Sequence, residues 1–242
     1  MSRPRTCPDF PWPVRTYPGK RALDVVLATA ALVLFSPVML LAAASVKLTS
    51  RGPVVYRGRR VGLCGQAFDQ FKFRSMYIGT GGTGFTKSAD DRITPVGRVI
   101  RLLKIDELPQ LFNVLRGEMS LVGPRPEDAS LVDEQYDGEQ LRVLSARPGL
   151  TCIVEVRWFP DFSYYLPPEV DPDEHYRRHL LPQRLRDDLE YVDRMSLWLD
   201  LKLIVQTIYC IGIKGWWIVL RHKLAARRDA ASHCDAPTRP RV

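Results

Sequence analysis

Two adjacent carboxylates, Asp106 and Glu107, stand in an otherwise apolar and basic stretch, LKIDELPQLFNVLRGEMSLVGPRP at residues 103–126. Cationic residues flank the pair in the sequence: Lys72, Arg74, Arg98, Arg101 and Lys104 before it, and Arg125 and Arg147 after it. Arginine side chains and helix N-termini bind phosphate oxygens. A carboxylate that such cations keep ionised can bind Mg²⁺, or attack phosphorus and form an aspartyl phosphate. The pattern therefore indicates chemistry on phosphorylated ligands.

A structural role is the simpler interpretation of the acidic pair. Asp106 suits the N-cap of a helix that has Glu107 and Pro109 in its first turn, which would stabilise that helix by about 1 kcal/mol. The surrounding cations favour the chemical interpretation. A second motif, GTGGTG at residues 79–84, matches G-x-G-x-x-G, but turn-forming residues follow it where a dinucleotide site needs a helix. We expect a mobile loop there.

The cysteines and histidines offer weaker candidates for a site. The five cysteines are scattered and form no CxxC pair, so the sequence suggests neither a zinc site nor a disulfide framework, and it favours a reducing, cytosol-facing environment. His175 and His179 lie one helical turn apart and could bind a metal. Because two arginines separate them and acids precede them, a solvated helix face is the favoured interpretation.

The composition allows one substantial domain with a buried core, since 45% of the 242 residues are hydrophobic and 26% are charged. There are 35 Lys and Arg against 27 Asp and Glu, and the pI is about 9.4. Such a charge suits nucleic acid, an anionic membrane surface or phosphorylated ligands. The chain has no basic strand with interleaved aromatic residues, so we expect no nucleic acid partner.

The N-terminal region predicts an association with a membrane. Residues 1–19 are rich in proline and lack periodicity, but no residue from Val25 to Val46 is charged. A straight helix of that length rises about 33 Å, enough for a bilayer core of about 30 Å. Ser36-Pro37 at its centre predicts a kink, and equal basic clusters on both flanks favour a helix that bends back to the cytoplasmic side. A spanning helix, a signal peptide and a buried core helix are the alternatives.

The rest of the chain predicts short elements with clear boundaries. Residues 52–76 form short alternating runs that are broken by glycines, as in a β-hairpin. Thr94-Pro95 begins one helix, Gly117 ends the next, and Ser196 caps a last one. Helical stretches are expected at about 172–180 and 183–195. Residues that suit a helix at the membrane interface gather near the C-terminus: Trp198, Lys214, Trp216, Trp217 and Arg221.

These motifs resemble the bacterial monotopic phosphoglycosyl transferases, also called bacterial sugar transferases. The resemblance covers about residues 20–210 and rests on KRALDVVLA…FSP, GPVVYRGRRVGLCGQAFDQFKFRSM, DELPQLFNVLRGEMSLVGPRP, RPGLT and LEYVDRMSLWLDLKLIVQT. It implies transfer of a sugar-1-phosphate from a UDP-sugar to undecaprenyl phosphate, which begins the assembly of capsule, exopolysaccharide or glycoprotein glycans. Many relatives carry an extra N-terminal membrane module, and this chain resembles the short, catalytic-core form.

The resemblance also assigns roles to residues. It implies that Asp106 is the nucleophile, that Glu107 is its partner, and that Mg²⁺ is the cofactor. Arg101 matches a phosphate-contacting arginine, and Ser36-Pro37 matches the helix-breaking pair of a re-entrant membrane helix. Residues expected to contact phosphate or nucleotide are Lys72, Arg74, Arg101, Arg125 and Arg147. After RPGLT, relatives continue with glycine and a QVxGRN-like stretch, but here CIVEVRWFPDF follows, so the sugar stays open.

We therefore expect an α/β, α-rich monotopic membrane protein at the cytoplasmic face of the bacterial inner membrane. Its expected parts are a disordered arm at 1–19, a re-entrant membrane helix at 20–50, a catalytic domain with a small hairpin and interfacial amphipathic helices at 51–226, and a disordered tail at 227–242. The expected partners are a UDP-sugar, undecaprenyl phosphate and membrane lipids, and a homodimer is left as an open option. A catalytically silent membrane scaffold of a glycan-assembly complex is the alternative function.

Overall fold

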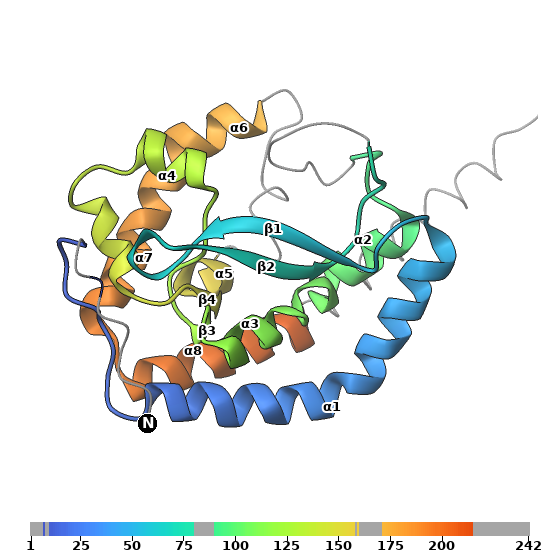
Figure 1. The fold of residues 1–242 in the computed structure, drawn as a ribbon, viewed down its shortest axis with the longest axis horizontal. Helices are drawn as coiled ribbons and strands as arrows, with labels where there is room; N and C mark the ends of the chain where they lie inside the picture. The colour runs from blue at the N-terminus through green and yellow to red at the C-terminus, as the bar shows by residue number, and fades with distance from the viewer. Residues whose placement is uncertain (1–6, 8–9, 80–89, 158, 160–170, 215–242) are drawn as a thin grey trace, which may run out of the picture.

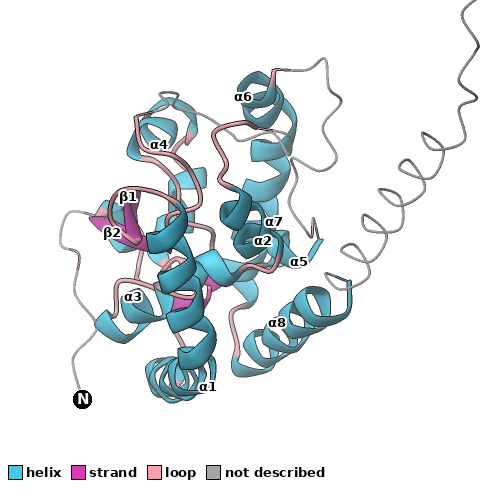
Figure 2. Cartoon of the chain, turned by 90° about the vertical axis from the view of Figure 1, so that its right-hand side faces the viewer, coloured by secondary structure: helices cyan, strands magenta, loops and turns pink. Residues whose placement is uncertain are grey.

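The computed structural model describes residues 7, 10–79, 90–157, 159 and 171–214, which form a mostly helical fold with two small sheets (Figures 1 and 2). The helices are α1 (Lys20–Thr49), α2 (Pro95–Leu102), α3 (Gln110–Arg116), α4 (Ala129–Gln135), α5 (Ile153–Arg157), α6 (Pro172–His175), α7 (Leu181–Arg194) and α8 (Leu197–Tyr209). The strands are β1 (Val55–Val61), β2 (Ala67–Phe73), β3 (Ser120–Val122) and β4 (Gly149–Thr151). The α-rich α/β class is confirmed.

Helix α1 is long and apolar enough to cross a membrane by length and composition. Only Lys20, Asp24 and Ala28 near its start and Ala42 and Val46 near its end are buried. The middle of the helix is apolar and exposed, with Val33 and Leu34 each 71% accessible. A helix buried in the core of a soluble domain would hide such residues, so the buried-core alternative is wrong. The fold is compatible with an α-rich monotopic membrane protein.

Pro37 lies inside α1 without breaking it, and Figure 1 shows that the helix changes direction along its length. Proline has no N–H to donate, so the carbonyl of Val33, four residues earlier, loses its usual helical partner. The Ser36 hydroxyl donates to this carbonyl at 2.8 Å. Serine therefore satisfies the group that proline leaves open, as serine side chains can do in bent helices. The return of the chain to the cytoplasmic side stays a prediction.

A buried ionic cluster holds the start of α1 against the domain. The Lys20 ammonium donates to Asp200 Oδ2 at 2.6 Å and to the Val122 carbonyl at 2.9 Å. Asp24 Oδ1 accepts from the Ser120 hydroxyl and the Leu121 amide at 2.9 and 3.0 Å. These bonds join α1 to β3 and α8. Their partners satisfy charges that would otherwise be costly to bury.

The residues just before α1 are ordered on the domain surface. Tyr17 donates to Asp200 Oδ2 at 2.7 Å, and the Arg15 amide donates to the Ser145 carbonyl at 2.8 Å. The prediction of a disordered arm is therefore wrong for residues 10–19, because long-range polar contacts order a segment that has no periodicity of its own. The first residues of that arm and the predicted tail lie outside the described residues, as do the GTGGTG motif from residue 80 onward and Trp216, Trp217 and Arg221.

The predicted hairpin is confirmed, with β1 and β2 antiparallel in a register that runs from Val55 opposite Phe73 to Val61 opposite Ala67. Cys64, in the turn between these strands, forms a disulfide with Cys7. The expectation that the cysteines form no disulfide is therefore wrong. The two cysteines are 57 residues apart, and only the path of the N-terminal segment along the domain brings them together. Cys152 and Cys210 are buried and free.

Three of the predicted helix boundaries are confirmed. The Thr94 hydroxyl accepts from the Gly97 amide at 2.8 Å at the start of α2, and Gly117 ends α3 with a φ of 79°. The Ser196 hydroxyl accepts from the Leu199 amide at 3.3 Å at the start of α8. Helix α8 buries Asp200 and Leu203 and exposes Trp198 to 80%. Its contact with the membrane interface stays a prediction.

The bend in α1 yields a prediction about topology. We expect cysteines at two exposed positions, Thr16→Cys and Arg51→Cys, to react with a membrane-impermeant thiol reagent only after the inner membrane is opened. The parent chain provides the background from native cysteines. Labelling of the residue 16 variant from the periplasm in intact cells would mean that α1 spans the bilayer.

Replacing Ser36-Pro37 with Ala-Leu gives the Val33 carbonyl an N–H partner again. We expect the helix to straighten and the two labelling sites to move to opposite sides of the membrane. If both sites stay cytoplasmic in this variant, other residues set the bend.

Candidate active site

The acidic pair lies in a single helical turn, Ile105–Glu107, between α2 and α3. Lys104, two residues after the end of α2, has a φ of 55°, in the left-handed region, and this turns the chain sharply into the acidic turn. Asp106 caps no helix, because Pro109 occupies the N-cap position of α3. The N-cap interpretation is therefore wrong. The side chain of Asp106 points into the protein and is only 8% exposed.

Asp106 is buried without enough polar partners. Its Oδ1 atom has no hydrogen-bond partner among the described residues. A buried carboxylate oxygen in this state is costly, and most such atoms in folded proteins are paired. The folded chain therefore buries a carboxylate oxygen that a bound ligand or cation could pair.

Cations from separate segments surround the pair. Lys72, on β2, donates to Glu107 Oε1 at 3.0 Å. Lys104 donates to Glu155 Oε2 at 3.1 Å, and Arg125 forms an ion pair with the same carboxylate. Glu155 on α5 thus fixes two cations that face the acidic pair. Positive and negative side chains therefore alternate from Lys72 on the hairpin, through Glu107 and Lys104, to Glu155 on α5.

The two neighbouring carboxylates have different pKa values. Burial and the charge of Glu107 raise the pKa of Asp106 to about 6, against the opposing charges of Lys72, Lys104 and Arg101. Burial also acts to raise the pKa of Glu107, but Lys72, Lys104 and Arg125 outweigh it and hold that pKa well below its usual range. Glu107 is therefore the firmly ionised member, and Asp106 is a poorly solvated and hence more reactive carboxylate.

The pair fits a magnesium ion that arrives with a phosphorylated ligand. Mg²⁺ commonly takes one or two protein carboxylates and completes its coordination with water and phosphate oxygens. Asp106 and Glu107 supply two carboxylates, and the buried Asp106 Oδ1 atom has no hydrogen-bond partner among the described residues. No group of three histidine, cysteine or acidic side chains suited to a metal occurs in the described part of the chain. His175 and His179, whose ring centroids lie 4.8 Å apart, belong to no such group.

The structure brings only some of the predicted phosphate-binding residues to the acidic pair. Lys72 contacts Glu107, and the charges of Arg101 and Arg125 act on the pair. Arg147 instead donates to the Gly117 carbonyl, at the end of α3, at 3.0 Å.

Arg74 has a structural position at the end of α1. Its guanidinium donates to the carbonyls of Pro53 and Ser50 at 2.5 and 2.7 Å and to the Ser50 hydroxyl at 2.8 Å. The side chain is buried. Arg74 lies just after the end of β2, and these contacts engage its guanidinium with the end of α1 rather than with the acidic pair. Its predicted phosphate contact stays a prediction.

Glu155 is the site residue that sequence reasoning missed. It lies in the stretch CIVEVR, where the chain departs from the pattern of the family it resembles. The only available signal was one acid between apolar residues on a short helix. Its contacts with Lys104 and Arg125 come from segments 51 and 30 residues earlier, and only the folded chain shows them.

Comparisons with known proteins identify the family of the chain. A family model described as bacterial sugar transferase matches residues 15–225. The chain is 42% identical over 194 residues to a UDP-glucose:undecaprenyl-phosphate glucose-1-phosphate transferase of Caulobacter vibrioides, which covers 78% of the chain and 68% of that protein.

Two further relatives differ in name and length. A UDP-N-acetylgalactosamine-undecaprenyl-phosphate N-acetylgalactosaminephosphotransferase of Aeromonas hydrophila is 40% identical over 197 residues, which is 79% of the chain and 43% of that protein. The exopolysaccharide production protein ExoY of Rhizobium meliloti is 37% identical over 228 residues, which is 86% of the chain and 92% of that protein.

Arg74 binds backbone carbonyls at the end of α1, whereas Arg101 lies near the acidic pair, and this difference leads to a prediction about stability. Arg74→Met should lower the free energy of unfolding by about 3 kcal/mol, because it removes several charged hydrogen bonds and leaves their carbonyls without a partner. Arg101→Met is the matched control and should cost about 1 kcal/mol or less. Urea unfolding in detergent measures both changes. Equal losses would contradict the structural role of Arg74.

Proposed function

Because the chain belongs to the bacterial sugar transferase family, we propose that it transfers a sugar-1-phosphate from a UDP-sugar to undecaprenyl phosphate and releases UMP. The names of the Caulobacter and Aeromonas relatives support the acceptor, and they also show that the sugar differs within the family. The relative ExoY supports a place at the start of exopolysaccharide assembly. A screen of UDP-sugars for UMP release, with undecaprenyl phosphate present, would identify the donor.

The observation that carries the proposal is the buried Asp106 carboxylate, one oxygen of which has no hydrogen-bond partner among the described residues. In the first step, Asp106 attacks the β-phosphorus of the UDP-sugar. A bond forms between the carboxylate oxygen and this phosphorus, while the bond to the bridging oxygen breaks and UMP leaves with that electron pair. The phosphosugar remains on Asp106. In the second step, the phosphate of the lipid attacks the same phosphorus and the carboxylate is released.

The surrounding cations suit the charges of this reaction. Lys72 keeps Glu107 ionised next to the nucleophile. Arg101 and Arg125 offer guanidinium groups near the pair, and Lys104 adds a third positive charge. Preorganised cations of this kind stabilise the negative charge that develops as phosphorus is attacked and UMP leaves.

Mg²⁺ is the cofactor of this proposal. When bound, it neutralises negative charge on the diphosphate. Asp106 and Glu107 are the residues that would hold it, with the substrate oxygens as further ligands. The fit rests on the two adjacent carboxylates and on the Asp106 oxygen that has no hydrogen-bond partner among the described residues.

The proposed location is the bacterial inner membrane, with the acidic pair on its cytoplasmic face. The exposed apolar middle of α1 supports a membrane location. The second half of this helix packs against the segment that carries the acidic pair, since Ala42 and Val46 share a core cluster with Ile100, and Ile105 packs against it. This contact would keep the nucleophile near the depth of a lipid phosphate. Contacts with membrane lipids, and a homodimer, stay predictions.

Removal of the nucleophile is the direct test. Asp106→Asn should lower transfer by about a thousandfold or more without unfolding the protein, because the amide cannot form the covalent intermediate. The matched control is Asp128→Asn. Asp128 is an exposed acid that forms an ion pair with Arg60 and has no part in the proposed reaction. Labelled UDP-sugar should leave its label on the wild-type peptide that contains Asp106. Substantial turnover by the Asp106→Asn variant would contradict the covalent mechanism and leave the family assignment untouched.

Removal of the metal tests the cofactor. A diphosphate beside two carboxylates carries too much negative charge to react efficiently, so excess EDTA should abolish UMP release and Mg²⁺ should restore it. In Glu107→Gln the concentration of Mg²⁺ needed for half-maximal activity should rise roughly tenfold, because one carboxylate ligand is lost. Full activity in excess chelator would overturn the metal requirement.

A further inference from the structure

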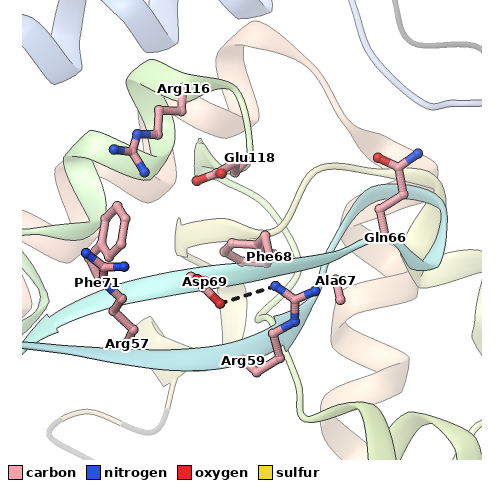
Figure 3. A pocket seen from close by; sticks show the side chains of 9 residues that line it. All are labelled: Arg57, Arg59, Gln66, Ala67, Phe68, Asp69, Phe71, Arg116 and Glu118. Carbon is pink, nitrogen blue, oxygen red and sulfur yellow. Dashed lines mark hydrogen bonds and ion pairs between the residues drawn. The ribbon is translucent and has the colours of Figure 1, made fainter.

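A hollow of about 350 Å³ lies on the hairpin, beside the C-terminal end of α3 (Figure 3). The side chains that line it are Arg57, Arg59, Gln66, Ala67, Phe68, Asp69, Phe71, Arg116 and Glu118. Three of these residues are arginines, from β1 and from the end of α3. The proposed transfer reaction uses none of them.

Two of the arginines meet at one aromatic ring. The guanidinium carbon of Arg116 lies 4.8 Å from the centroid of the Phe71 ring, and that of Arg57 lies 5.8 Å from it. Figure 3 shows both side chains directed at the ring. Cation–π contacts of this kind hold the guanidinium planes in place and leave their N–H groups able to bind an anion.

The carboxylates of the hollow are engaged with other partners. Asp69 pairs with Arg59 at 3.2 Å, and Glu118 accepts from Asn113 Nδ2 at 2.7 Å. Within the described part of the chain, no carboxylate forms an ion pair with Arg57 or Arg116. Two like charges held at one ring repel each other unless an anion lies between them. The hollow therefore holds three arginines against two carboxylates, a net charge of +1.

The hollow is separate from the acidic pair. Successive side chains of a strand point to opposite faces, so Phe71 and Lys72 project in opposite directions from β2. Lys72 reaches Glu107, while Phe71 meets the two arginines. An anion bound at Phe71 would leave the proposed catalytic face open.

The helix that carries Arg116 packs against the first half of α1, where Ala28 shares a core cluster with Leu111 and Val114. Arg21 on α1 donates to the carbonyls of Val114 and Leu115 on α3, at 2.5 and 2.7 Å. One turn before Arg116 on the same face of α3, Phe112 is 48% exposed. An exposed aromatic residue followed by an arginine suits the boundary between lipid tails and headgroups.

We propose that Arg57 and Arg116, arranged around Phe71, bind a phosphate oxyanion, and that the headgroup of an anionic phospholipid supplies it. Two guanidinium groups can bind one phosphate through several charge-assisted hydrogen bonds. The bound headgroup would fix the rotation of the hairpin, and hence of Lys72, relative to the membrane surface. The proposal rests on the proposed membrane location of the chain and is independent of the transfer reaction.

Lipid binding by the full-length protein in detergent tests the proposal. The protein is titrated with phosphatidylglycerol or with phosphatidylcholine, and retained lipid is counted by native mass spectrometry. We expect the wild type to hold one phosphatidylglycerol that phosphatidylcholine does not replace. Arg57→Gln with Arg116→Gln should bind it at least about tenfold more weakly, since each arginine contributes charged hydrogen bonds. Arg59→Gln, whose arginine already pairs with Asp69 in the same hollow, is the matched control and should bind as the wild type does.

Two further measurements test whether a lipid supplies the phosphate and whether the planar guanidinium groups are needed to bind it. Inorganic phosphate at millimolar concentration should not displace the lipid, and if it does, the lipid assignment is wrong. The double variant with lysine at both positions keeps the charge and loses the planar fork, so intermediate binding is expected. Equal phosphatidylglycerol retention by the wild type and the Gln variant, with unchanged melting temperatures, would overturn the site. UMP release by the same samples shows separately whether the proposed function holds.

Discussion

The burial of two adjacent carboxylates is the constraint on which the rest of the site depends. Asp106 and Glu107 repel each other and lose water together, and each effect disfavours a second charge. Cations must therefore converge on them, and no single element could supply enough. Lys72 comes from the hairpin, Lys104 from the turn itself, and Arg125 from the loop after β3. Glu155 then holds two of these cations in place. The fold can thus be understood as a means of bringing these segments around one turn.

The same residues connect the acidic pair to the helix that is exposed to the membrane. Along β2, Lys72 binds Glu107, and two residues later Arg74 binds the carbonyl of Ser50 at the end of α1. The second half of α1 packs against Phe73, Ile100 and Ile105. A shift of the helix would therefore move both the acidic pair and Lys72. The proposed transfer between a soluble donor and a lipid acceptor would need such coupling, because the reacting atoms must meet at a fixed depth.

The hairpin has two faces with different chemistry. One face directs Lys72 to the acidic pair, and the other directs Phe71 to two arginines. A strand alternates its side chains strictly, so adjacent residues can serve a reaction and a surface contact without competing. The disulfide between Cys7 and Cys64 and the polar contacts of residues 15 and 17 hold the N-terminal segment along the domain. The start of α1 and the hairpin turn are thereby connected from outside the core.

Local patterns in the sequence determined the elements. Alternation and glycines gave the hairpin, Thr94 and Ser196 gave two helix starts, Gly117 gave a helix end, and the uncharged run gave α1 with its proline. The long motif around Asp106 identified the family and the candidate nucleophile. Each of these signals depends on neighbours within a few residues. Tertiary structure decided the partners of the charged side chains. Arg74 binds the carbonyl of Ser50 at the end of α1, and Asp106 caps no helix. Glu155 and the Cys7–Cys64 disulfide each join segments that are far apart in sequence. A charged residue looks alike in every sequence context, and its role depends on which distant groups the packed chain places within hydrogen-bond distance.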